Sequence, residues 1–76
     1  MKEVKYKIIQ HLADLGEQDE NGWVTQLNIV QWGHWAPAYD IRKWQYDENS
    51  KVIAMSKGIV LHEDQFKALI EFCKNY

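Results

Sequence analysis

The feature that most constrains this chain is its small size, combined with the lack of any staple that could hold a small core together. Cys73 is the only cysteine among 76 residues, so no internal disulfide can form. No paired Cys/His spacing offers a structural zinc site either. A domain below about 80 residues without such staples often gains its missing stability by oligomerising. Length and cysteine count therefore predict one domain over residues 1–76 that assembles as a homodimer.

Aromatic side chains are more numerous than so small a core needs. The chain contains four Trp, four Tyr and two Phe, within a composition that is 46% hydrophobic and 26% charged. That balance is typical of a folded soluble domain rather than of a disordered tail. We therefore expect some of the rings to face outward.

Composition also bears on location and partners. No apolar run approaches the ~20 residues that span a bilayer, so we expect no membrane partner. Gln10, His11 and Asp14 interrupt any signal-peptide apolar region. With one free thiol and no export signal, we expect a cytoplasmic protein. The net charge of -2 argues weakly against nucleic acid. However, much of the acid is concentrated in residues 14–22, which leaves the strands free to carry a local basic face.

Hydrophobic patterning predicts a run of strands. Three segments are rich in β-branched and aromatic residues or alternate in polarity, namely 23–32, 39–46 and 51–61. Polar turns at 16–22 and 47–50 precede or separate them. Gly58, inside the last of these strands, marks a bulge or a close backbone approach.

The last segment, residues 62–76, changes period. Its apolar residues recur at i, i+3, i+4 and i+7, which is one face of a helix: Phe66, Leu69, Ile70 and Cys73. We expect this stripe to pack on the sheet and across the dimer, with Cys73 acting as a small core hydrophobe. His62 takes the N-cap position, where Ser, Thr, Asp or Asn would accept the first free amide better.

The first segment fits two structures. Alternation of Val4, Tyr6 and Ile8 predicts a strand. A helical stripe is also present, formed by Ile8, Ile9, Leu12 and Leu15. The pattern alone does not choose between them.

No catalytic site is indicated. Asp40 and Arg42 share a strand face, and an ion pair explains them more simply than acid–base chemistry does. The three histidines are far apart in the chain and show no metal-ligand spacing. Neither a glycine-rich phosphate loop nor a nucleophile elbow is present. We therefore expect no enzyme activity, no cofactor and no metal.

One strand face combines rings with a cation, because Arg42, Trp44 and Tyr46 project to the same side. Trp32 and Trp35 flank the turn that leads into this strand. Single-stranded nucleic acid needs such a surface, since bases stack on rings and cations follow the phosphates. The alternative is that the tryptophans complete the core or a dimer interface.

An ordered series of motifs points to a known family. It runs from Tyr39-Asp40-Ile41-Arg42-Lys43-Trp44 through a polar turn to Ser56-Lys57-Gly58-Ile59-Val60-Leu61, and then to Gln65-Phe66 and Leu69. This order resembles the positive-cofactor-four family of transcriptional coactivators. Gly22-Trp23 and Leu27-Asn28 ahead of Trp32 look closest to its bacterial YdbC-like branch. The resemblance covers about residues 22 to 72.

The resemblance implies an α+β fold, with a four-stranded, strongly bent antiparallel sheet followed by one C-terminal helix (ββββα), assembled as a homodimer. It places the first segment in a strand. It also implies sequence-tolerant binding of single-stranded DNA, either as a transcriptional coactivator or regulator or in protecting melted DNA. Two alternatives stay open: a binder of single-stranded RNA, and a protein-interaction module that docks on the transcription machinery.

The resemblance and the aromatic pattern together nominate the nucleic-acid contacts Trp23, Asn28, Trp32, Trp35, Arg42, Lys43, Trp44 and Lys57. Arg42 matches the family's backbone- and base-contacting arginine, and Lys57 matches the lysine of its Lys-Gly-Ile motif. Trp32 and Trp44 match aromatics on the second and third strands.

Two positions depart from the family pattern. Gln45 stands where more basic relatives have a stacking tryptophan, and Ser56 stands where they double the basic residue. The extra Trp23 and Trp35 are candidates to replace the lost stacking.

Overall fold

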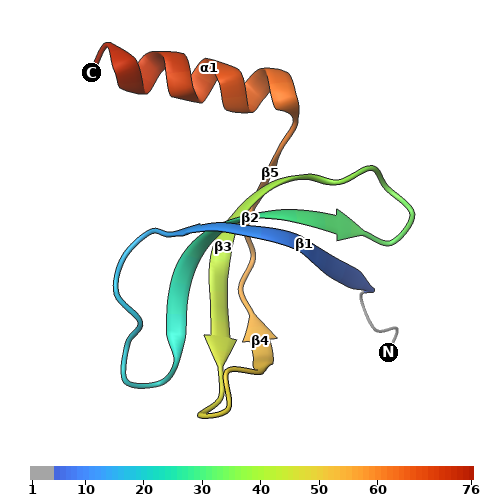
Figure 1. Ribbon diagram of the computed structural model, residues 1–76, viewed down its shortest axis with the longest axis vertical. Helices are drawn as coiled ribbons and strands as arrows, with labels where there is room; N and C mark the ends of the chain where they lie inside the picture. Colours follow the sequence, from blue (N-terminus) through green and yellow to red (C-terminus); the bar gives the residue numbers. More distant parts are fainter. Residues whose placement is uncertain (1–4) are drawn as a thin grey trace.

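The computed structural model describes residues 5–76 (Figure 1). Its elements are β1 (Tyr6–Asp14), β2 (Trp23–Trp32), β3 (Ala38–Tyr46), β4 (Val52–Met55), β5 (Ile59–Leu61) and α1 (Glu63–Lys74). The first segment is thus a strand over its described part, as the resemblance implied. Val4, which contributes to the alternation predicted there, lies outside the described residues.

The strands form one antiparallel sheet in the order β1-β2-β3-β4. β4 pairs with the last part of β3, and β5 pairs with its first part. The predicted fold of an antiparallel sheet followed by one C-terminal helix is confirmed. The strand predicted over residues 51–61 is divided into β4 and β5, which both pair with β3. Between them the chain passes so close to β3 that a Cβ on Gly58 would collide with Arg42 Cβ and lie 2.5 Å from Ile41 O. Gly58 is therefore the close approach that the sequence predicted.

The sheet curls strongly. In the strand register Tyr6 lies opposite Trp32 on one side of β2, and Trp44 lies opposite Val24 on the other. A flat strand would separate Trp32 from Val24 by about 26 Å. Yet the Tyr6 ring centroid is 5.6 Å from that of Trp32 and 5.4 Å from that of Trp44. Two register shifts in β1 are typical of bulges that increase such bending.

The buried core lies on the concave side of this curl, which we call the inner face. Its apolar members are Val24, Val30 and Trp44, the only buried hydrophobic residues in the described part of the chain. Buried polar residues share the same face: Gln26, Asn28 and Asp40. The opposite side of the sheet, the outer face, carries the alternate residues of each strand.

The helix is attached to the sheet at one point. The Phe66 ring stacks on Tyr39 with centroids 3.8 Å apart, and α1 otherwise extends away from the strands (Figure 1). His62 occupies the N-cap, and its backbone N–H donates to Gln65 Oε1 at 2.9 Å. No described residue of α1 is buried, and Cys73 is exposed. The prediction that Cys73 is a core residue is therefore wrong for the protomer, because nothing covers the stripe beyond Phe66.

No helix among residues 5–76 has the length and apolar character that a membrane crossing requires.

Replacing Trp44 with Ala should destabilise the fold by about 3–5 kcal/mol, because it removes the largest fully buried side chain. The free energy of unfolding in urea measures this effect. Trp35→Ala is the matched control, since Trp35 is 79% exposed and its loss should cost at most about 0.5 kcal/mol. Equal effects of the two substitutions would contradict the assignment of Trp44 to the core.

Gly58→Ala should destabilise the protein by about 1–3 kcal/mol, because the added methyl group overpacks the crossing of the chain over Arg42. Thermal unfolding followed by circular dichroism tests this. Lys57→Ala, at the exposed neighbouring position, should leave the unfolding temperature almost unchanged. A Gly58→Ala protein as stable as the parent would show that the crossing tolerates a side chain.

Candidate nucleic-acid interface

The structure distributes the predicted contact residues over four places. The inner face holds Asn28, Trp32, Arg42 and Trp44, whereas Trp23 and Lys43 lie on the outer face. Lys57 lies in the link between β4 and β5, and Trp35 lies in the turn between β2 and β3. The set does not form one continuous surface.

Trp44 is the main departure from expectation. It shares a face with Arg42 and Tyr46, as predicted, but that face is the interior of the curl and the Trp44 side chain has 0% exposure. Tyr6 packs against its ring. A base needs a free ring face on which to stack, so the expected exposed position of Trp44 is wrong. Asn28 is likewise 0% exposed.

Arg42 is held in a buried ion pair. Its Nε donates to Asp40 Oδ1 and its Nη2 donates to Asp40 Oδ2, each at 2.7 Å, while Nη1 donates to Ser56 O at 3.3 Å. The Arg42 side chain is only 12% exposed and that of Asp40 is fully buried. Such a bidentate pair compensates both charges. The predicted ion pair is confirmed, and its geometry ties β3 to the segment that follows β4.

Trp32 is partly covered by the same guanidinium. The Arg42 Cζ atom lies 4.4 Å from the centre of the Trp32 ring, a cation–π arrangement. Tyr6 packs against the ring at a tilt of 44°. Trp32 Nε1 is buried without a hydrogen-bond partner. The Trp32 ring therefore packs within the inner face, and Arg42 and Tyr6 occupy positions that a stacking base would need.

The rest of the inner face is a network of polar side chains that the sequence analysis missed. His11 lies 2.6 Å from the Asn28 amide and 3.2 Å from Asp14. Gln26 donates to Asp14 at 3.0 Å and accepts from the Tyr46 hydroxyl at 2.8 Å. The signal that could have revealed this network is the alternation of Gln26 and Asn28 with apolar residues along one strand.

Tyr46 shows what this environment does to an ionisable group. Burial raises the pKa of its hydroxyl, and the Asp14 carboxylate raises it further. The phenol therefore stays neutral at neutral pH, and its hydroxyl donates a hydrogen bond to Gln26 Oε1.

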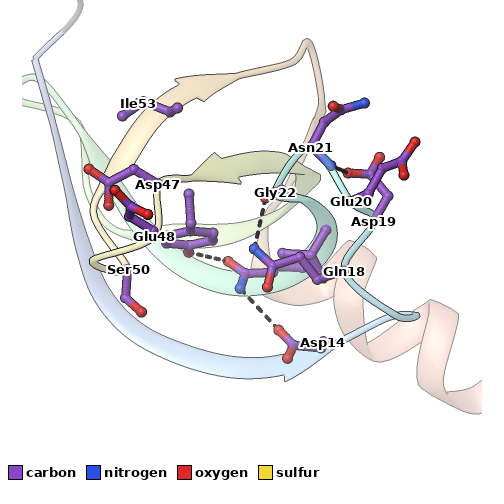
Figure 2. A pocket seen from close by; sticks show the side chains of 13 residues that line it. Asp14, Gln18, Asp19, Glu20, Asn21, Gly22, Asp47, Glu48, Ser50 and Ile53 are labelled. Atoms are coloured by element: carbon purple, nitrogen blue, oxygen red, sulfur yellow. Dashed lines mark hydrogen bonds between the residues drawn. The ribbon is translucent and has the colours of Figure 1, made fainter.

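A pocket of about 750 Å³ opens at one end of the inner face, between the β1–β2 and β3–β4 turns. Figure 2 shows the acidic side chains that surround it, namely Asp14, Asp19, Glu20, Asp47 and Glu48. A hollow with this potential repels phosphate. No group of three or more His, Cys, Asp or Glu side chains in the described part of the chain is arranged to hold a metal ion.

The outer face offers a different surface near the same end of the sheet. Trp23 lies directly opposite Gln45, and Thr25 lies directly opposite Lys43. The Lys43 N–H donates to Ser56 Oγ at 3.0 Å, and the Ser56 N–H donates to Lys43 O at 2.9 Å. These bonds bring the backbone of the β4–β5 link, and with it Lys57, beside Lys43. We call Trp23, Thr25, Lys43, Gln45 and Lys57 the outer patch.

The outer patch has the chemistry that the inner face lacks. Lys43 and Lys57 are exposed, and within residues 5–76 neither pairs with a carboxylate. Trp23 is half-buried, so part of its ring is accessible. Trp23 also stands across the strand pair from Gln45, the position at which the resemblance implied a lost stacking ring. A ring and the Lys43 cation therefore lie on one side of the sheet, and the β4–β5 link that carries the exposed Lys57 runs beside Lys43.

Comparison with known proteins gives one match. The family model described as Transcriptional Coactivator p15 (PC4) matches residues 20–72, from just before β2 into the last part of α1. No curated protein matches the chain. The family is a nucleic-acid-binding, non-enzymatic one, and membership suggests single-stranded DNA binding and a coactivator-like role. Because the matched residues make up well over half of the chain, this protein belongs to the transcriptional coactivator p15 (PC4) family of single-stranded DNA-binding proteins.

Proposed function

We propose that this protein is a homodimer that binds single-stranded DNA with little dependence on base sequence, in the cytoplasm, to regulate transcription or to protect melted DNA. The observation that carries this proposal is the outer patch, where a partly exposed tryptophan shares a face with Lys43, beside the link that carries Lys57, and neither lysine has a carboxylate partner within residues 5–76. Family membership supplies the class of ligand.

The mechanism follows from the two faces. A base stacks on Trp23, which is worth about 1–3 kcal/mol, and the ammonium groups of Lys43 and Lys57 compensate neighbouring phosphates. The acidic pocket lies on the inner face, so its potential favours a path for the strand along the outer face. Paired DNA hides the faces of its bases from the ring, and this gives unpaired strands the advantage.

The dimer is supported by how much surface the protomer exposes. Its accessible area is 6282 Å², whereas a compact monomer of 9.1 kDa exposes about 4,900 Å². Its radius of gyration is 13.5 Å, against about 11.4 Å for a compact chain of this length. An excess of about 1,400 Å² lies in the range that one partner of an obligate dimer buries.

The exposed apolar side chains show where that surface lies. Most of them lie on α1, β5 and β1, namely Leu69, Ile70, Phe72, Ile59, Val60, Ile9 and Leu12. A second copy of the chain packed on this surface would bury the unpartnered stripe of α1. The short length and the lack of disulfides suggested a dimer for the same physical reason. A protomer core of only a few residues supplies little stability, and a partner can supply the rest.

Trp23→Ala should weaken binding of a fluorescently labelled oligothymidine by about fivefold to a hundredfold, because a stacking contact is lost. Trp23→Phe, which keeps a ring, should retain most of the affinity. Fluorescence anisotropy at low salt measures both. If the parent protein does not bind at low salt, the proposed function fails. A parallel titration with oligouridine distinguishes a DNA binder from an RNA binder.

The double variant Lys43→Gln, Lys57→Gln should flatten the salt dependence of binding. Each phosphate contact on a single strand contributes about 0.7 to the slope of log affinity against log salt, so the slope should fall by about 1.4. Lys67→Gln on the exposed side of α1 is the control and should leave the slope unchanged. Binding to a transcription protein that is insensitive to salt, without oligonucleotide affinity, would instead select the protein-interaction alternative.

Ile70→Asp should shift the protein toward the monomer, because it places a charge in the apolar surface that a second copy would cover. Sedimentation equilibrium at micromolar concentration measures the change. Glu71→Gln, at the adjacent exposed position, should leave the parent dimer intact. A parent protein that sediments as a monomer would overturn the dimer.

A further inference from the structure

One tryptophan stands outside both faces of the sheet. Trp35 lies in the turn between β2 and β3 and is 79% exposed. All four tryptophans belong to the described part of the chain, and Trp35 is the only one with a largely free ring, since Trp44 is buried and Arg42 covers Trp32. Exposing so large an apolar ring is unfavourable unless a partner covers it.

The turn holds Trp35 in a defined place. Gly33 adopts the left-handed region with φ of 54°, and its N–H donates to Lys5 O at 2.8 Å. The Trp35 N–H donates to Trp32 O at 2.9 Å, which closes the turn. The backbone that carries the ring is thus tied to both β1 and β2, so the ring is presented from a fixed base rather than from a free loop.

The charges on the β1 side of this turn are positive, whereas on the side of α1 Glu63 lines a pocket together with Pro37 and Ala38. Residues 31–39 contain no Asp, Glu, Lys or Arg. The adjoining strand β1 contributes Lys7, which lies opposite Gln31, and Lys5 precedes it. Both lysines are exposed, and neither pairs with a carboxylate within residues 5–76. The acidic pocket is lined mainly by the β1–β2 and β3–β4 turns, which lie at the other end of the strands from the β2–β3 turn (Figure 1).

We propose that Trp35, with Lys5 and Lys7, forms a second contact patch for single-stranded nucleic acid, in which a base stacks on Trp35 and the lysines compensate phosphates. We call it the end patch. The inference rests on the proposed function and deepens it, because it gives the strand a second point of attachment. A free ring beside uncompensated cations is the combination that single-strand binding uses.

The end patch is separate from the outer patch. Trp23 begins β2 and Trp35 lies in the turn that follows this strand, so the route between the two rings along the outer face of the curled strand has a contour length of about 30 Å. A short oligonucleotide can occupy only one patch of a protomer, whereas a longer one reaches both. Loss of Trp35 should therefore affect long strands more than short ones.

The test compares oligothymidines of about 4 and about 20 nucleotides, which bracket common site sizes of about 4–16 nucleotides. Trp35→Ala should weaken binding of the longer strand by about fivefold to a hundredfold and that of the shorter strand by much less. Trp35→Phe should bind the longer strand nearly as the parent does, but with a smaller quenching of intrinsic fluorescence, because the stacked indole is gone. Ile53→Ala, at an exposed apolar position beside the acidic pocket, is the control and should bind as the parent does.

The outcomes separate the two proposals. If the parent binds oligothymidine and Trp35→Ala binds both lengths equally well, the end patch is overturned while the proposed function stands. If the parent itself does not bind, the proposed function fails and the end patch fails with it. A Trp35→Ala protein with a lowered unfolding temperature and weakened binding would assign Trp35 a structural role. Trp35-dependent binding to anionic phosphatidylserine vesicles, with oligothymidine affinity unchanged, would assign the ring to a membrane surface instead.

Discussion

The curl of the sheet is the constraint on which the rest of the structure depends. Tyr6 on β1 packs against Trp44 on β3, across a strand that would hold them far apart if the sheet were flat. This closure turns one face of the sheet into the interior and removes Trp44 from solvent. A chain of this length has few apolar side chains to spare, and the curl concentrates them at one place. The surface available to a ligand must then lie outside the concave inner face.

Charge compensation follows the same division. On the inner face Arg42 is matched by Asp40, and the polar side chains around Gln26 satisfy one another, so that face has little left to offer a ligand. Around the acidic pocket the uncompensated charge is negative. Among the exposed lysines without carboxylate partners within residues 5–76, Lys43 lies on the outer face and Lys5 and Lys7 lie beside the β2–β3 turn. Charges that are paired within the protomer stabilise the fold, whereas unpaired charges on the surface are available to a ligand.

The helix illustrates the limits of a small protomer. Phe66 anchors α1 on Tyr39, but the apolar stripe beyond it has no cover within one chain. Leu69 and Ile70 are each 41% exposed, which is far more than a core position allows. Periodicity correctly predicts that these residues form one apolar face of a helix. It cannot predict whether that face is covered by the same chain or by another.

After the first segment, whose pattern fits both a strand and a helix, the sequence alone determined where strands and the helix form, because periods of 2 and 3.6 and the polar turns are local properties of the chain. It did not show that the last strand is divided into β4 and β5. It also determined the Asp40–Arg42 pair, the close approach at Gly58 and the family. Only the tertiary structure decided which side of β3 is inside, since strict alternation separates two faces without saying which one is buried. The sign of the curvature placed Trp44 in the core. The register of β2 against β3 set Trp23 across from Gln45, and the β2–β3 turn left Trp35 as the exposed ring.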